Sequence, residues 1–262
     1  MSLFRVAFFG FFEFFVANSF SAENFVDSRF QGILATKSTK KNRKPFWGGL
    51  LCRGGLLSVL AKVCGLVRAE DVTFAAAEGA DLLGFVCHPP SPRHCADLAL
   101  AAPFLDRAVL VQVADDAEVI LATARRHGFQ KVQPYLPAAV RGQGIRLLRE
   151  AGLHVLLPWA DEPDQAQVVA DLYLWEPSAK ATGLLGGSGQ GHPMAHPPPG
   201  PYLLAGGLDA TNLSARWHAI PATLRHHLRG ADAASRLEAS PGRKDPDKVR
   251  AFIRLAHALE SP

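Results

Sequence analysis

Short apolar runs alternate with amphipathic segments along most of this chain, from residue 59 onward. The apolar runs are continuous, which is typical of parallel strands that are buried on both faces. The segments between them carry apolar residues at helical spacing, and several end at a glycine. The pattern predicts strands over residues 59–63, 82–86, 108–113, 131–135, 155–157, 172–175, 202–205 and 231–234.

Helices are predicted between most of these strands, over residues 68–79, 96–105, 117–127, 137–151, 164–170, 210–220 and 246–259. Eight strands that are each followed by a helix or a long loop fit a compact α/β protein, a (β/α)8 TIM barrel. An open doubly wound sheet is the alternative. That fold usually carries a glycine-rich nucleotide loop near its start, and Cys64-Gly65-Leu66 is not such a loop.

Residues 1–58 differ in composition from the rest of the chain. They carry eight Lys and Arg against three Asp and Glu, a balance of +5, whereas residues 59–262 carry 20 against 21, a balance of −1. The high pI of about 9.0 therefore belongs to this extension and does not predict that the body binds nucleic acid. The extension fits a secretory signal, an organellar transit segment or, as we favour, a leader and linker outside the functional domain. We therefore expect a barrel over residues 59–262.

Composition excludes several other classes of protein. The chain is 48% apolar and 20% charged, which is ordinary for a globular protein. Four cysteines are too few for a disulfide scaffold, and the longest apolar runs are shorter than the ~20 residues of a membrane-spanning helix. His192 and His196 lie in a Gly/Pro loop without a visible third ligand, so we predict no metal site.

Two side chains at predicted strand ends are candidates for proton transfer, because a barrel holds its active site where strands end. Cys64 ends the first strand and precedes a helix, whose N-terminus favours a thiolate; the alternative is a small buried apolar residue. Glu176 follows the apolar run 172–175. Apolar surroundings can raise the pKa of a carboxyl group, which can then serve as a general acid; the alternative is a solvated loop carboxylate.

Glycine turns follow the seventh and eighth predicted strands, at Gly206-Gly207 and in the segment 232–235. Backbone N–H groups in these two loops commonly bind phosphate in (β/α)8 barrels. Glycine has no Cβ that would hold a phosphate oxygen away from those N–H groups. The turns therefore indicate a phosphate site, although a purely steric reason for the glycines remains open.

Six motifs together resemble the phosphoribosylanthranilate isomerase family of tryptophan biosynthesis, over about residues 59–259. They occur in the family's order, and the first and third are the most specific. They are Lys62-Val63-Cys64-Gly65-Leu66, Glu78–Val86, Ser91-Pro92-Arg93, Gly186-Gly187-Ser188-Gly189, Leu204-Ala205-Gly206-Gly207-Leu208 and Pro241-Gly242-Arg243-Lys244-Asp245.

This resemblance implies a cofactor-free Amadori rearrangement of N-(5-phosphoribosyl)anthranilate to a 1-amino-1-deoxyribulose phosphate. Cys64 would be the base, and Glu176 would hold the place of the family's acid, which is an Asp. Arg93 would face the anthranilate carboxylate, and Gln133 and Asp232 would contact the substrate. By the same resemblance, the phosphate-binding residues would be Gly206, Gly207, Ser235 and Arg236.

The sequence departs from the family pattern where Glu176 replaces an Asp, Tyr135 a His and Arg236 a Gly, and His192-Pro193-Met194 stands in place of the family's Phe-Asp-Trp. Two alternatives to an active isomerase therefore stay open: a barrel that keeps the phosphate site and acts as a binding or scaffold protein, and a related phosphosugar isomerase. A thiolate base needs reducing surroundings, which favours the cytoplasm. We expect a small phosphosugar as the partner, with no nucleic acid, membrane, metal or cofactor; the oligomeric state is left open.

Overall fold

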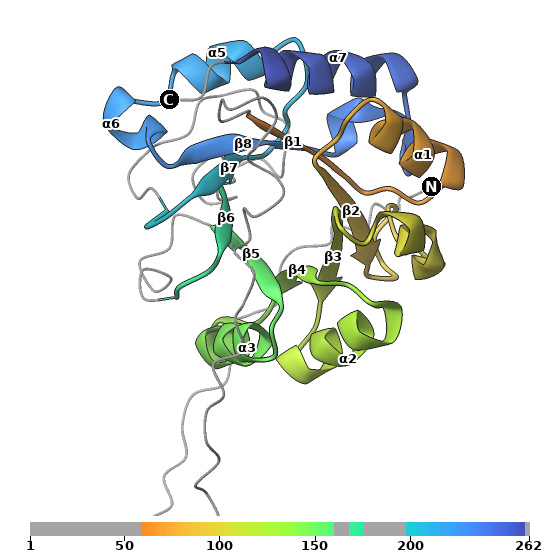
Figure 1. Ribbon diagram of the computed structural model, residues 1–262, viewed down its shortest axis with the longest axis vertical. Helices are drawn as coiled ribbons and strands as arrows, with labels where there is room; N and C mark the ends of the chain where they lie inside the picture. Colours follow the sequence, from red (N-terminus) through yellow and green to blue (C-terminus); the bar gives the residue numbers. More distant parts are fainter. Residues whose placement is uncertain (1–58, 160–167, 176–197, 260–262) are drawn as a thin grey trace, which may run out of the picture. The chain divides into compact units, whose positions relative to one another are not determined.

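A closed barrel of eight parallel strands forms the centre of the fold (Figure 1). The computed structural model describes residues 59–159, 168–175 and 198–259, and the strands pair in chain order until β8 returns to β1. The (β/α)8 prediction is confirmed and the open sheet is excluded. The strands are β1 (Leu60–Cys64), β2 (Leu82–Cys87), β3 (Ala108–Val113), β4 (Lys131–Tyr135), β5 (His154–Trp159), β6 (Leu172–Trp175), β7 (Tyr202–Leu204) and β8 (Leu228–Ala233).

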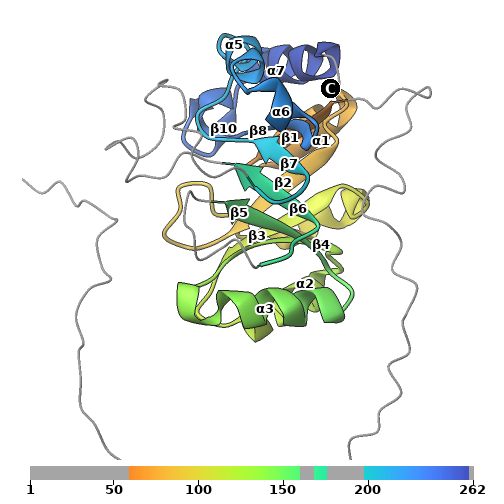
Figure 2. The same ribbon diagram turned by 90° about the vertical axis from the view of Figure 1, so that its left-hand side faces the viewer.

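Helices surround this barrel, with α2 and α3 on one side of it and α5 and α7 on the opposite side (Figure 2). The described helices are α1 (Ala69–Ala77), α2 (Ala117–His127), α3 (Ala138–Glu150), α5 (Leu213–His218), α6 (Ala222–Arg225) and α7 (Pro246–Ala258). Two 3₁₀ segments, η1 (Leu98–Phe104) and η3 (Ser235–Leu237), and a hairpin of β9 (Glu238–Ser240) and β10 (Arg243–Lys244) complete the described part.

Three predicted segments differ from the structure or lie at least partly outside the described residues. The helix predicted over 96–105 is a 3₁₀ helix over Leu98–Phe104 with Pro103 inside it, because proline removes a backbone donor and disfavours a continuing α-helix. Residues 164–167 of the predicted helix over 164–170 lie outside the described residues. The extension 1–58 does too, so the division of the chain at residue 58 stays a prediction.

Apolar side chains fill the inside of the barrel in alternating register. On β1, Leu60 and Cys64 belong to an interior cluster with residues from most other strands, while Ala61 and Val63 pack outward under the helices. This two-sided burial explains why the strands are continuous apolar runs in the sequence. Other members of the interior cluster are Leu82, Val109, Val111, Leu156, Leu172, Leu174, Leu203 and Ala205.

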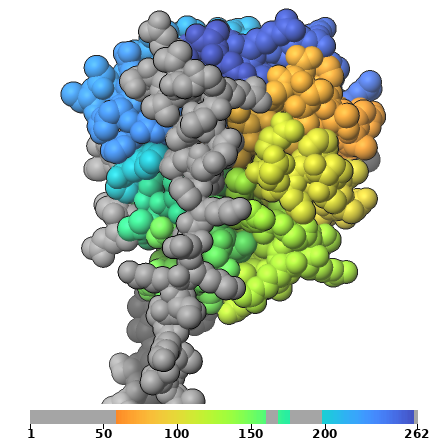
Figure 3. Space-filling model, viewed as in Figure 1, coloured from red at the N-terminus to blue at the C-terminus, as the bar shows by residue number. Residues whose placement is uncertain are grey.

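Local signals fix where the outer helices begin and end. Asp116 accepts a hydrogen bond from the N–H of Glu118 at the start of α2, and Gly128 ends that helix with φ 78°. Asp245 accepts two backbone hydrogen bonds at the start of α7, which has proline at its first position. The surfaces of α7 and α1 adjoin (Figure 3), where Arg250 pairs with Glu78 at 3.0 Å.

Within the described part of the chain, every helix lacks the combination of length and apolar character that a membrane crossing demands.

The close contact of β8 with β1 leads to a stability prediction. A Cβ on Gly230 would lie 2.2 Å from the carbonyl oxygen of Leu60, a backbone atom that cannot move aside alone. We expect Gly230→Ala to lower the free energy of unfolding by about 3 kcal/mol, measured by urea denaturation. Gly142→Ala in α3 is the matched control: its nearest neighbours would be 3.9 and 4.0 Å away, so it should stabilise by up to about 1 kcal/mol. Equal stability of the two variants would contradict this account.

Candidate active site

Cys64 lies at the carboxyl end of β1, on the rim where (β/α)8 enzymes hold their active sites. The residue is 7% exposed and packs in the interior cluster. Gly65 follows with φ 75°, which turns the chain, and its N–H donates to the carbonyl oxygen of Gly84 at 3.0 Å. A Cβ on Gly84 would lie 2.7 Å from the Cys64 Sγ atom, so the bare backbone of β2 makes room for the thiol.

A buried ion pair lies beside Cys64 inside the barrel. Lys62, two residues earlier on β1, is 0% exposed, and its Nζ donates to Oδ1 of Asp232 at 2.7 Å. The two residues are register partners across the β1–β8 seam. Burial alone would lower the pKa of Lys62, but the Asp232 carboxylate and the Cys64 sulfur raise that pKa above its ordinary value. Lys62 is therefore an ammonium ion at neutral pH.

The surrounding charges act on the Cys64 thiol in both directions. Burial raises its pKa above the ordinary value of 9.0, and the Asp232 carboxylate adds to that rise. The ammonium groups of Lys62 and Lys244 act in the opposite sense. In the absence of a ligand, Cys64 is consequently a thiol at neutral pH, and its reactivity depends on the nearby lysines.

Arg93, which the resemblance placed at a carboxylate, is bound to a carboxylate of the protein itself. Its Nε and Nη2 donate to the two oxygens of Glu238 at 2.7 and 2.8 Å, a bidentate arrangement. The Nζ of Lys244 donates to the same Glu238 carboxylate at 3.1 Å and to the carbonyl oxygen of Ala234 at 3.0 Å. This network ties the loop after β2 to the hairpin after β8, at the rim next to Cys64.

Gln133 places an amide inside the barrel on β4. The residue is 2% exposed, and its Nε2 donates to the hydroxyl of Tyr135 at 3.0 Å. Within the described ranges, its Oε1 has no hydrogen-bond partner. A buried acceptor without a partner is costly, so this oxygen is suited to accept a hydrogen bond from a ligand.

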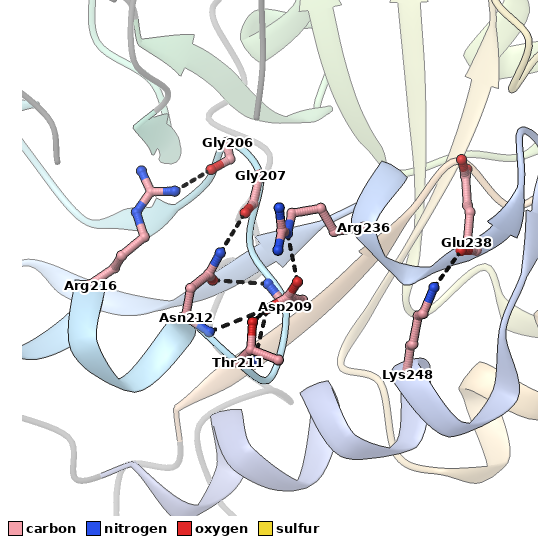
Figure 4. Close-up of polar contacts among 9 residues, drawn as sticks. All are labelled: Gly206, Gly207, Asp209, Thr211, Asn212, Arg216, Arg236, Glu238 and Lys248. Carbon is pink, nitrogen blue, oxygen red and sulfur yellow. Dashed lines mark hydrogen bonds and ion pairs between the residues drawn. The ribbon is translucent and has the colours of Figure 1, made fainter. Parts of the chain in front are cut away.

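Two glycines with positive φ form the turn after β7. Gly206 and Gly207 have φ values of 85° and 63°. Arg216 donates to the Gly206 carbonyl at 2.5 Å, and Asn212 donates to the Gly207 carbonyl at 2.9 Å (Figure 4). In a planar trans peptide the N–H points opposite to the carbonyl. The N–H groups of Gly207 and Leu208 therefore point away from α5.

Arg236 reaches from η3 to the loop after β7. Its Nε donates to Oδ2 of Asp209 at 2.6 Å, and Oδ1 of Asp209 accepts from the N–H and hydroxyl of Thr211 (Figure 4). Burial would raise the pKa of Asp209, but the hydrogen bonds from Thr211 and Arg236 hold it below its ordinary value. A cavity of about 560 Å³ lies between this loop, Ser235, Arg236 and Lys248.

The structure thus brings several predicted site residues to one end of the barrel, and another lies outside the described residues. Cys64 and Asp232 both lie beside Lys62, whereas Glu176 lies outside the described residues. Sequence reasoning gave no role to three residues of this site: Lys62, Glu238 and Lys244. A lysine within an apolar strand was the visible signal for Lys62, and Lys244 stood inside a quoted motif. Among the described residues, no three His, Cys, Asp or Glu side chains form a metal site.

A closed parallel barrel with polar groups gathered at its carboxyl rim defines a (β/α)8-barrel enzyme. No family model matches the chain. The N-(5'-phosphoribosyl)anthranilate isomerase of Azorhizobium caulinodans is 36% identical over 231 residues, covering 78% of this chain and 94% of that protein. The one from Rhodopseudomonas palustris (strain BisB18) is 33% identical over 227 residues, covering 78% and 98%. The chain belongs to the N-(5'-phosphoribosyl)anthranilate isomerase family.

The solved structures agree with this family. The crystal structure of phosphoribosyl anthranilate isomerase from Thermus thermophilus matches with a TM-score of 0.59 and 27% identity. The match covers 76% of this chain and the whole of that one.

Proposed function

We propose that this chain is an active phosphoribosylanthranilate isomerase, which converts N-(5-phosphoribosyl)anthranilate into 1-(2-carboxyphenylamino)-1-deoxyribulose 5-phosphate. The reaction moves hydrogen within one molecule: C2 of the sugar is oxidised and C1 is reduced, so no external oxidant, reductant or cofactor is needed. The observation that carries the proposal is a buried thiol at the end of β1 in a barrel of this family.

Cys64 acts as the base in this proposal. After the furanose ring opens, C1 and the anthranilate nitrogen form a protonated imine, which acidifies the hydrogen on C2. The Cys64 thiolate takes that proton, the C2–H electron pair forms the C1–C2 double bond, and the imine nitrogen becomes neutral. The resulting enol then tautomerises to the ketone. The position of the thiol inside the rim, shielded from water at 7% exposure, supports this role.

Glu176 acts as the acid that protonates the furanose oxygen and so opens the ring. This residue directly follows β6, on which Leu172 and Leu174, at the two preceding alternate positions, belong to the interior cluster. A Glu is one methylene longer than the family's Asp. The carboxyl group of Glu176 must therefore lie about one bond length further from its Cα than the family's Asp carboxyl does from its own. The proposal requires the side chain or the substrate to shift by that amount.

Four groups hold the phosphate end of the substrate in this proposal: Gly206, Gly207, Ser235 and Arg236. The backbone N–H directions of the turn after β7 support it, as does the position of Ser235 and Arg236 beside a cavity. Arg236 would add a cation that a glycine cannot supply. Its Nε is held by Asp209, and the rest of its guanidinium would meet the phosphate.

The anthranilate end is proposed to meet Arg93. Because Nε and Nη2 already bind Glu238, the outer edge of the guanidinium, formed by Nη1 and Nη2, would bind the aromatic carboxylate. Gln133 would accept a hydrogen bond from the substrate through its Oε1, and Asp232 would contact the amine and ribose. The partner is thus a small phosphosugar, and we place the protein in the reducing cytoplasm because its base is a thiolate.

Gly84 offers a prediction about the position of the base. In Gly84→Ala the new Cβ would lie 2.7 Å from Sγ and 3.1 Å from the Cα of Cys64, so the sulfur must move. A displacement of the base by about 1 Å can cost ~100-fold in rate, so we expect kcat to fall by about that factor while KM changes little. Steady-state kinetics measure this. An unchanged kcat would show that the sulfur's position is not critical.

The direct test of the proposed function is an assay of the purified full chain with N-(5-phosphoribosyl)anthranilate, followed through the change in anthranilate fluorescence. We expect conversion well above the uncatalysed rate. A second candidate, a barrel that binds a phosphosugar without turnover, is favoured by Tyr135, which stands where the family has a His and whose hydroxyl accepts a hydrogen bond from Gln133. Binding of the product without conversion of the substrate would support that second candidate and reject the first.

A further inference from the structure

We propose that Lys62 is a positioning residue for the base: its buried ammonium group stabilises the Cys64 thiolate and holds the Asp232 carboxylate in place beside it. This inference deepens the proposed function and rests on Cys64 being the base. Nothing in the family resemblance gave Lys62 a role.

Lys62 points into the barrel from the same strand face as Cys64. Leu60 and Cys64, the residues two before and two after it, are both in the interior cluster. The lysine is 0% exposed, and it contacts Asp232 on the neighbouring β8 at 2.7 Å. A lysine ammonium has three donors, and Asp232 Oδ1 takes one of them. The remaining donors are available to the sulfur of Cys64, which together with Asp232 raises the pKa of the lysine.

Stability alone does not explain a charged pair at this place. Moving an ammonium and a carboxylate out of water costs several kcal/mol each, and their mutual attraction repays this only when the geometry is excellent. Two apolar side chains of similar volume often stabilise such a place equally well or better. Most other side chains inside the barrel are apolar, among them Leu82, the register partner of Lys62 on β2. The ion pair is therefore better explained by an action on its neighbour Cys64.

The charges that face Cys64 come from three elements. Lys62 lies on β1 itself, Asp232 on β8, and Lys244 on β10, where it is held by Glu238. On β2 the facing residue is Gly84, which has no side chain. Two cations oppose one anion, and Lys62 has the strongest effect of the three on the pKa of the thiol. Removing the charge of Lys62 should therefore leave burial and Asp232 to favour the neutral thiol.

The experiment measures the pH dependence of alkylation of Cys64 by iodoacetamide in the full chain, without substrate, with the modified peptide identified by mass spectrometry. Only a thiolate reacts, so the midpoint reports the ionisation of Cys64. Lys62→Gln removes the charge but keeps a donor for Asp232. We expect the midpoint to rise by at least about one pH unit, which lowers the rate at neutral pH about tenfold. Lys62→Met, which removes the donor as well, should shift the midpoint in the same direction.

A second readout separates this role from a merely structural one. In Lys62→Gln, kcat at neutral pH should fall about tenfold with little change in KM, and the loss should be recovered at higher pH. Lys131→Gln is the matched control. Lys131 is also a buried lysine, on β4, but its Nζ donates to the carbonyl oxygen of Asp106, so its removal should leave the Cys64 midpoint unchanged.

Two outcomes overturn the inference: an unchanged or lowered alkylation midpoint in folded Lys62→Gln or Lys62→Met protein, or an equal shift in Lys131→Gln. Because alkylation needs no turnover, this result does not depend on the isomerase activity. Failure of the proposed function gives a different signature, in which the midpoint shifts as expected but a variant without the Cys64 thiol converts the substrate normally.

Discussion

Replacing Cys64 with Ala is expected to reduce kcat for the isomerisation by a factor of about 10³ or more, with KM changed by only a few-fold. Positioned acid–base groups typically contribute a factor of ~10²–10⁴ to a rate. Our account names no other side chain among the described residues that could act as the base instead of Cys64. The fold should survive, because Ala is small and Cys64 makes its contacts inside an otherwise apolar cluster. Steady-state kinetics and circular dichroism of the purified variant measure both expectations.

The control for this variant is a second thiol of the same barrel. Cys87 ends β2 and is partly exposed, and our account gives it no part in the reaction. Cys87→Ala should therefore keep the wild-type kcat. Cys64→Ser should remain nearly inactive, because a hydroxyl is a far weaker acid than a thiol and forms almost no anion at neutral pH. Wild-type turnover by Cys64→Ala would remove the proposed base.

Substitution of Glu176 is expected to have the second large effect on kcat. Glu176→Gln keeps the length of the side chain but cannot donate a proton as a carboxylic acid does, so ring opening should slow and kcat should fall by about 10²–10⁴. Glu176→Asp restores the residue found in the family and keeps the acid, so it should retain at least the wild-type rate. The pH dependence of kcat/KM should lose its descending limb in Glu176→Gln. Equal rates in the Gln and wild-type proteins would assign the acid to another group.

The sequence predicted the barrel well because parallel strands inside a barrel are apolar on both faces. Each run read as a strand, including the short β4 at Lys131–Tyr135, pairs in the closed sheet. The end of β1 was predicted within one residue, and that placed Cys64 on the rim. Boundaries were less accurate where the pattern was weak: β8 begins at Leu228 rather than 231.

Long-range pairs could not be predicted from local patterns. Arg93 and Glu238 are 145 residues apart, and Lys62 and Asp232 are 170 apart, so only the closure of the barrel brings them together. The hairpin β9–β10 was missed because its strands have only three and two residues. The family resemblance named Arg93 and Asp232 as ligand contacts. The resemblance could not show that Arg93 already forms an ion pair with Glu238, and Asp232 with Lys62.

The central claim is that this chain is a working isomerase and not only a phosphate-binding barrel. Complementation of a tryptophan auxotroph that lacks this isomerase, with the full chain and its Cys64→Ala variant expressed side by side, tests it most directly. The account predicts growth without tryptophan for the wild-type chain and no growth for the variant. Absence of growth with a folded, well-expressed wild-type chain, or equal growth with both, would contradict it.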